Sequence, residues 1–249
     1  MEDSDFAVPS LPTLSSATDK KVHDFPRPTV AVDTALLTPD LDHQQLLVAQ
    51  MWRADTRKWA LPGTFVRKGE TLADAVQRCL REKLGIEGIR THQLHVFDDP
   101  DRDDRDWVMS VAHLAVVRPD RLRTLGSGSA AQTRFVPVDR PGELAWDHPE
   151  IVRLAKHEIR RRYEASADPE HLLGRTFTLR ELQRVHEAVA GTALDRDRFR
   201  RAMEHRVVAT GEIRENTGSR GRPAELFRRK PPAGLSRTKP PAGLSRTKP

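Results

Sequence analysis

The segment from residue 58 to residue 86 constrains the fold more than any other part of this chain. Thr71 can cap a helix, with Asp74 three residues later as its capping partner, and Gly85 can end it. The apolar residues within the helix recur at spacings of three and four, so one face must be buried. They are Leu72, Ala75, Val76, Cys79, Leu80 and Leu84. The segment therefore predicts a loop followed by an amphipathic helix that packs on a core.

Strand-like runs surround this helix. They cover residues 30–37, 44–50, 94–99, 107–117 and 135–139, and a second helix is predicted to start near Asp147 and to run to Tyr163. Strands that alternate with a central and a closing helix are typical of an α+β sandwich with helices on both faces of a sheet. Residues 28–166 are accordingly predicted to form one domain, and residues 1–27 a disordered tail.

A different pattern occupies residues 167–230. Thr178 and Glu181 form a capping box that opens one helix, and Gly191 ends it with a tight turn. A second helix is predicted over residues 195–206, with Phe199, Ala202 and Met203 facing inward, followed by two short strands around a loop at 214–223. This order of elements predicts a winged helix-turn-helix domain. Residues 231–249 contain a nine-residue repeat that is basic and rich in proline, and we expect it to remain unfolded.

The charge of the 249-residue chain is unevenly distributed. Residues 1–150 carry 19 Lys and Arg against 24 Asp and Glu, whereas residues 151–249 carry 23 against 12. This excess is either a solubilising surface or, as we expect of a strongly basic second part, a binding surface for a polyanionic partner such as DNA.

Other classes of protein are excluded by composition. No apolar run approaches the roughly 18 residues of a membrane span, so we expect no membrane partner. The first residues lack the apolar core of a secretory signal. Cys79 is the one cysteine, which excludes a disulfide framework and a cysteine-based zinc site. We therefore predict a cytoplasmic protein.

The segment 58–86 resembles the Nudix box, a family signature. Six residues fall in register with that signature: Glu70, Arg78, Leu80, Glu82, Gly85 and Ile86. The stretch from Trp59 to Gly63 is similar as well. The resemblance implies a Nudix-like α/β/α sandwich, in which clustered carboxylates on the helix hold Mg²⁺ against a diphosphate and activate water.

That carboxylate cluster is broken in this chain. Thr64 takes the place of the leading glycine of the signature, and Cys79 and Lys83 take the places of two metal-binding glutamates. One remaining carboxylate, Glu82, is a poor magnesium site, so the sequence predicts a domain without catalysis, metal or cofactor. Glu70 and Arg78 then either form a structural ion pair or belong to a pocket that still binds a nucleoside diphosphate.

The loop 98–106 alternates aspartate and arginine and allows two interpretations. Its charges can pair with one another, or Arg102 and Arg105 can reach a ligand phosphate at the rim of the pocket. The expected effector-binding residues are Trp59, Glu70, Arg78, Glu82, Arg102 and Arg105.

Basic residues in the second part are placed where a winged helix contacts DNA. Around the helix 195–206 lie Arg196, Arg198, Arg200, Arg201 and His205, and the wing loop carries Arg220 and Arg222. Arginine reads guanine and also contacts phosphate. We expect Arg196 and Arg198 to enter the major groove, and the two wing arginines to follow the phosphates or enter the minor groove.

Taken together, a degenerate Nudix domain followed by a winged helix that ends in Gly221–Arg228 is similar to the Nudix-related transcriptional regulators of NAD metabolism. The resemblance covers about residues 28–229. It implies a homodimeric repressor of NAD biosynthesis or salvage genes that binds a palindromic double-stranded DNA operator and responds to ADP-ribose. The alternative is an active Nudix hydrolase of ADP-ribose or another nucleoside diphosphate derivative.

Overall fold

A computed structural model describes residues 25–122, 132–215 and 223–230. Its seven-stranded sheet contains β1 (Thr29–Asp40), β2 (Gln45–Arg53), β3 (Lys58–Ala60), β4 (Gly63–Phe65), β5 (Thr91–Phe97), β6 (Val108–Val116) and β7 (Thr133–Pro137). The strands run in the order β3-β2-β1-β6-β5, with β4 paired to β1 and β7 to β2. The long β1 pairs in parallel with β6 from Thr29 to Leu37, and the other pairings in the sheet are antiparallel.

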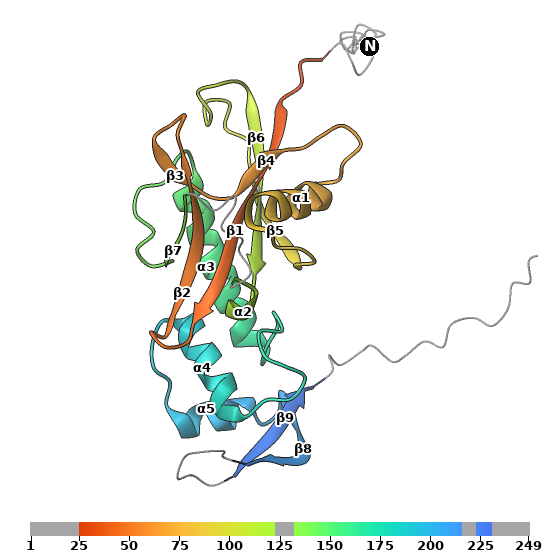
Figure 1. Ribbon diagram of the computed structural model, residues 1–249, viewed down its shortest axis with the longest axis vertical. Helices are drawn as coiled ribbons and strands as arrows, with labels where there is room; N and C mark the ends of the chain where they lie inside the picture. The colour runs from red at the N-terminus through yellow and green to blue at the C-terminus, as the bar shows by residue number, and fades with distance from the viewer. Residues whose placement is uncertain (1–24, 123–131, 216–222, 231–249) are drawn as a thin grey trace, which may run out of the picture.

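Helices cover both faces of this sheet (Figure 1). The helix α1 (Leu72–Leu84) packs on one face with Leu36, and α3 (His148–Ala165) packs on the other with Leu37. Neighbouring residues of a strand point to opposite faces, and because helices cover both faces β1 is buried from Ala31 to Pro39. A short helix, α2 (Pro119–Leu122), follows β6. The predicted α/β/α sandwich is confirmed.

Local sequence signals set the ends of α1. Thr71 accepts a hydrogen bond from the backbone N–H of Asp74, and Asp74 accepts from the N–H of Thr71, which completes the capping box. Gly85 ends the helix in the left-handed region at φ 63°. This termination holds the C-terminal turn of α1 beside β4.

The second part is a winged helix, as predicted. It contains α4 (Leu179–Ala190), α5 (Arg196–Met203) and a hairpin of β8 (Val207–Arg214) and β9 (Ala224–Arg229). Phe199 and Met203, one turn apart, are buried in its small core, but Ala202 is exposed, contrary to prediction, because it lies about 100° around the helix from Met203.

The two parts share one core rather than meeting at a polar surface. Val185 and Val189 of α4 are buried in the same apolar cluster as Tyr163 of α3 and Leu46 of β2. Arg184 of α4 also donates to Asp42 at the turn between β1 and β2 at 2.8 Å. The winged helix is therefore held against the sandwich through α4 (Figure 1).

Candidate functional sites

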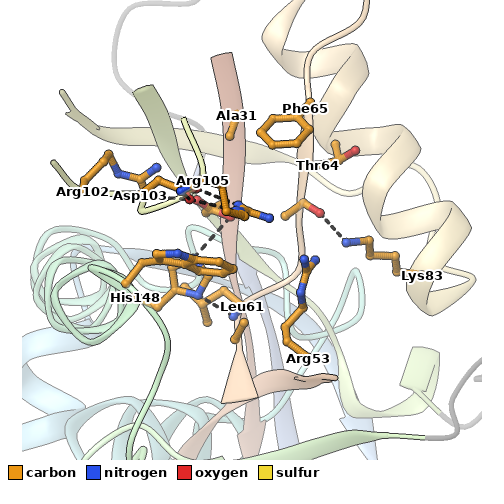
Figure 2. Close-up of a pocket in the computed structure, with 14 residues that line it drawn as sticks. Ala31, Arg53, Leu61, Thr64, Phe65, Lys83, Arg102, Asp103, Arg105 and His148 are labelled. Atoms are coloured by element: carbon orange, nitrogen blue, oxygen red, sulfur yellow. Dashed lines mark hydrogen bonds and ion pairs between the residues drawn. The ribbon is translucent and has the colours of Figure 1, made fainter. Parts of the chain in front are cut away.

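A pocket opens where β1, β3 and β4 meet the loop 98–106 and the start of α3 (Figure 2). Fourteen residues line it: Ala31, Asp33, Arg53, Ala60, Leu61, Gly63, Thr64, Phe65, Lys83, Arg102, Asp103, Arg105, Trp146 and His148. The mixture of aromatic rings, four cationic side chains and two carboxylates suits a polar ligand that also carries a planar group.

Asp33 is one of two buried carboxylates that line this pocket, with Asp103. Its carboxylate accepts a hydrogen bond from the Ser110 hydroxyl at 2.6 Å and lies 3.4 Å from Nε2 of His148. Burial opposes ionisation of Asp33, but the imidazole of His148, the hydrogen bond from Ser110 and the positive charge of Arg102 lower its pKa below the ordinary value. Asp33 is therefore a carboxylate at neutral pH.

His148 has a defined tautomer. The backbone N–H of Leu61 donates to Nδ1 at 2.8 Å, so Nδ1 is unprotonated and the neutral ring carries its proton on Nε2. Nε2 is buried and makes no hydrogen bond of good geometry with any described residue, although Asp33 is 3.4 Å away. This N–H is a donor directed at the carboxylate in the pocket wall.

Gly63 is the position where the backbone comes closest to Asp33. A Cβ atom added there would lie 1.9 Å from Oδ1 of Asp33 and 3.1 Å from the carbonyl oxygen of Val32. The close pairing of β4 with β1, in which Gly63 opposes Asp33, leaves no room for a side chain.

Each of the three arginines in the pocket is matched to a carboxylate. Arg53 pairs with Asp55 at 2.5 Å, Arg102 with Asp147 at 2.7 Å and Arg105 with Asp103 at 2.6 Å. The sequence left open whether the loop 98–106 pairs within itself or faces a ligand. In the structure Arg105 pairs within the loop and also lines the pocket, whereas Arg102 pairs with Asp147 outside the loop.

Aromatic rings sit beside two of these arginines. The guanidinium of Arg105 lies 4.8 Å from the ring centre of Trp146 and 5.8 Å from that of Phe65. Arg53 lies 5.7 Å from the same Trp146 ring. Flat π faces next to guanidinium groups form a surface on which a planar, electron-rich group can stack.

Four of the six expected effector-binding residues do not line the pocket: Trp59, Glu70, Arg78 and Glu82. Trp59 packs instead against Trp52 and under Arg134, whose guanidinium is 4.0 Å from its ring centre. The alternation of side chains along β3 turns Trp59 away from the pocket that its neighbour Ala60 lines.

Glu70 and Arg78 form the structural ion pair that was one of the two predicted alternatives. Arg78 donates to both carboxylate oxygens of Glu70, at 2.7 and 2.9 Å, and also to the Phe65 carbonyl at 2.9 Å. This hydrogen bonding lowers the pKa of Glu70 to about 2. Arg78 thus holds the loop to α1 behind the pocket wall, and Glu82 approaches Arg78 at 3.6 Å.

Arg102 differs from expectation in another way. It lines the pocket, but its side chain is only 5% exposed, so it belongs to the wall and not to the rim. Two hydrogen bonds of 2.7 Å to Asp147 and an ion pair with Asp33 at 3.8 Å hold the Arg102 side chain in the wall.

A second candidate site lies on the winged helix. A groove between α4 and α5 is lined by three arginines, Arg180, Arg196 and Arg200, together with Leu179, Gln183 and Phe199. Arg198, Arg201 and His205 are exposed elsewhere on the segment 196–205. Successive residues of a helix are about 100° apart, so Arg201 lies roughly opposite buried Phe199 and Met203. Arg220 and Arg222 lie outside the described residues.

Sequence reasoning missed Asp33, His148 and Ser110. Asp33 had a signal, since it is the one charged residue in the strand-like run 30–37, and an unexplained charge in a buried strand indicates a site. Ser110 and His148 had none, because they lie 77 and 115 residues from Asp33 in the chain and approach it only in the folded sheet.

Comparisons with known proteins agree with this architecture. The Nudix domain family matches residues 27–155, and the NrtR DNA-binding winged helix domain matches residues 169–229. The chain is 29% identical over 213 residues to the ADPR responsive transcriptional repressor NtrR of Acinetobacter baylyi, covering 82% of this chain and 83% of that protein.

Two further similarities concern structure and chemistry. The crystal structure of Shewanella oneidensis NrtR with a 27mer DNA is similar with a TM-score of 0.66 and 30% identity, over 81% of this chain and 93% of that one. The ADP-ribose pyrophosphatase of Methanocaldococcus jannaschii is 31% identical over 134 residues, which is 54% of this chain and 76% of the enzyme.

Proposed function

Because the chain belongs to the NrtR family of Nudix-domain transcriptional regulators, we propose that it is a DNA-binding repressor whose Nudix domain senses a phosphorylated metabolite. The observation that carries this proposal is the shared core. The helix α4 packs into the Nudix sandwich, so a change at the pocket can reach the winged helix through α4. No helix in the described residues could cross a membrane.

We assign DNA contacts according to the two flanks of α5. Arg198, Arg201 and His205 project away from the winged-helix core and would face base edges in the major groove. Arg196 and Arg200 face Arg180 across the groove between α4 and α5, where three guanidinium groups suit a phosphate of the DNA backbone. Arg196 thus moves from the base-reading role expected from sequence to a phosphate-binding one. Arg220 and Arg222 keep their proposed role in the wing.

ADP-ribose is the proposed effector. The relative from Acinetobacter baylyi is named for its response to this molecule. The pocket offers stacking surfaces at Trp146 and Phe65 and cationic groups for a diphosphate. In this proposal Arg102 and Arg105 are the ligand-binding residues among the six expected ones, while Glu70, Arg78, Glu82 and Trp59 support the wall.

We propose that the Nudix domain does not catalyse hydrolysis. Cys79 and Lys83 stand where the family signature has metal-binding glutamates. The relative from Methanocaldococcus jannaschii is an ADP-ribose pyrophosphatase, so hydrolysis is the alternative to test. With Mg²⁺ present, turnover of about 1 per second or more would be that of an ordinary enzyme and would favour the alternative.

The remaining features of the proposal follow from the DNA target. A single winged helix offers few contacts, so a homodimer on a palindromic operator is expected. A repressor must reach its operator, so the proposed location is the cytoplasm. Genes of NAD biosynthesis or salvage are the proposed targets, because the family that the chain resembles regulates NAD metabolism.

The test is DNA binding measured by fluorescence anisotropy. The full chain is titrated into duplexes from its own upstream region and into scrambled duplexes, with and without ADP-ribose. We expect preference for one palindromic site and weaker binding when ADP-ribose is added, in proportion to its preference for the DNA-free state. Equal binding to all duplexes would contradict a specific repressor, and operator binding unchanged by ADP-ribose would exclude that effector.

A further inference from the structure

We propose that the ammonium group of Lys83 is a built-in counter-cation for the phosphates of the effector, so that the pocket binds its ligand without a divalent metal ion. The inference rests on the proposed function, since it assumes that a phosphorylated molecule enters this pocket. Lys83 then binds the ligand itself, in addition to removing a metal-binding glutamate.

Lys83 differs from the other cations of the pocket in its ion pairing. Arg53, Arg102 and Arg105 each form ion pairs with a carboxylate at 2.5 to 2.7 Å. Among the described residues, no carboxylate lies within ion-pairing distance of Lys83, whose hydrogen-bond acceptor is the carbonyl oxygen of Gly63. An incoming phosphate would have to compete with a carboxylate for each arginine, whereas the ammonium of Lys83 can donate to it without displacing a carboxylate.

Geometry directs this ammonium at the pocket. Lys83 lies in the last turn of α1, is half-buried and extends toward the strand that carries Gly63 and Thr64 (Figure 2). One of its three N–H groups is used by the Gly63 carbonyl, which leaves two for a ligand. The C-terminal end of a helix also favours a cation, so the charge is stabilised where it stands.

The groups around Lys83 do not fit a magnesium ion. Magnesium requires several oxygen ligands in octahedral geometry. Burial raises the pKa of the Cys79 thiol to about 11, so it stays a neutral thiol, and Glu82 is directed at Arg78 and Arg67, at 3.6 and 3.9 Å. Within the described part of the chain, no group of three or more His, Cys, Asp or Glu side chains is arranged to hold a metal. A diphosphate in this pocket needs another source of positive charge, and Lys83 supplies it.

The experiment is isothermal titration calorimetry on the full chain with two titrants, ADP-ribose and inorganic pyrophosphate, each in EDTA and in excess Mg²⁺. Lys83→Met removes the charge and keeps the apolar stem, and Lys83→Glu restores the carboxylate of the family signature. Lys68→Met is the matched control, because this exposed lysine lies in the loop before α1 and does not line the pocket. Thermal melting of every variant verifies folding.

We expect the parent chain to bind ADP-ribose with the same Kd in EDTA and in Mg²⁺. Lys83→Met should weaken binding about tenfold or more, the loss of one charge-assisted hydrogen bond, and Lys83→Glu should weaken it further in EDTA. Lys68→Met should bind like the parent. Tighter binding of the parent in Mg²⁺ than in EDTA, or a folded Lys83→Met that binds like the parent, would overturn the inference.

The two titrants separate this inference from the proposed effector. If ADP-ribose does not bind the parent chain but pyrophosphate does, and Lys83→Met weakens that binding, the effector is wrong while the role of Lys83 stands. If ADP-ribose binds and Lys83→Met leaves its Kd unchanged, the effector stands and the role of Lys83 falls. Binding of neither titrant would overturn both.

Discussion

The guanidinium of Arg229, on the last strand of the wing, donates to the buried carboxylate of Asp168 at 2.6 Å. Asp168 also accepts from the Tyr163 hydroxyl at 3.0 Å and from the backbone N–H groups of Leu172 and Leu173. One fully buried side chain therefore ties α3, the connection to the winged helix, and β9 together. Asp168 thus adds a buried, charged contact to the backbone hydrogen bonds between Phe177 and Phe227 that also hold β9 in place.

Asp168→Ala should destabilise the protein by about 3–5 kcal/mol, because it leaves Arg229 without its carboxylate partner and several buried donors without an acceptor. Urea denaturation followed by circular dichroism measures the change. Asp42→Ala is the control, since the pair of Asp42 with Arg184 also joins the two parts but Asp42 is 88% exposed, and it should cost less than about 1 kcal/mol. Equal effects of the two substitutions would contradict a buried junction.

Gly63→Ala should disrupt the pocket, because the new methyl would lie 1.9 Å from Oδ1 of Asp33. Either β4 separates from β1 or Asp33 leaves its bond with Ser110, and both outcomes should lower the melting temperature and weaken effector binding. Gly174→Ala is the control, because its Cβ would meet an atom only at an ordinary 3.5 Å.

A double variant makes this prediction specific. Removing the carboxylate with Asp33→Ala takes away the atom that the Gly63→Ala methyl strikes. The double variant should then lose less stability than the sum of the two single variants, as residues in contact do. Additive losses would show that the clash is not with Asp33.

The Glu70–Arg78 ion pair should make stability depend on pH in the acid range. Its hydrogen bonds with Arg78 lower the pKa of Glu70 from 4.5 to about 2 in the folded state, so the stabilisation is fully present above pH 4.5 and is lost as pH falls toward 2. The difference in unfolding free energy between the parent and Glu70→Gln should be constant near neutrality and shrink over that window. A difference that does not change with pH would mean that the pair is not formed.

Substitutions on the two flanks of α5 should separate base recognition from phosphate binding. Arg201→Ala should cost about 1–3 kcal/mol at the operator and relax the preference at one base pair in each half-site. Arg200→Ala should weaken binding to operator and scrambled duplexes alike and reduce the salt slope by about one unit. Binding over a salt series measures both. If both variants behave like the parent, the DNA lies on another surface.

The sequence by itself determined what depends on neighbouring residues. The capping boxes at Thr71 and Thr178 and the terminating Gly85 and Gly191 each act within four or five residues, so helix positions could be predicted from short windows. The apolar spacing predicted which faces are buried, and the chain order of elements predicted a sandwich followed by a winged helix. The replacements Cys79 and Lys83 were also visible in the sequence as departures from the family signature.

Only the tertiary structure decided which side chains share the pocket. His148 meets the backbone of Leu61 across 87 residues of chain, and Lys83 meets Gly63 across 20, because the pairing of β4 with β1 and the packing of α1 and α3 on opposite faces bring them to one place. The pairing of β3 with β2, in which Trp59 lies opposite Trp52, turned Trp59 away from the pocket. Side-chain direction alternates along a strand and depends on register, and register is set by contacts between strands that are distant in sequence.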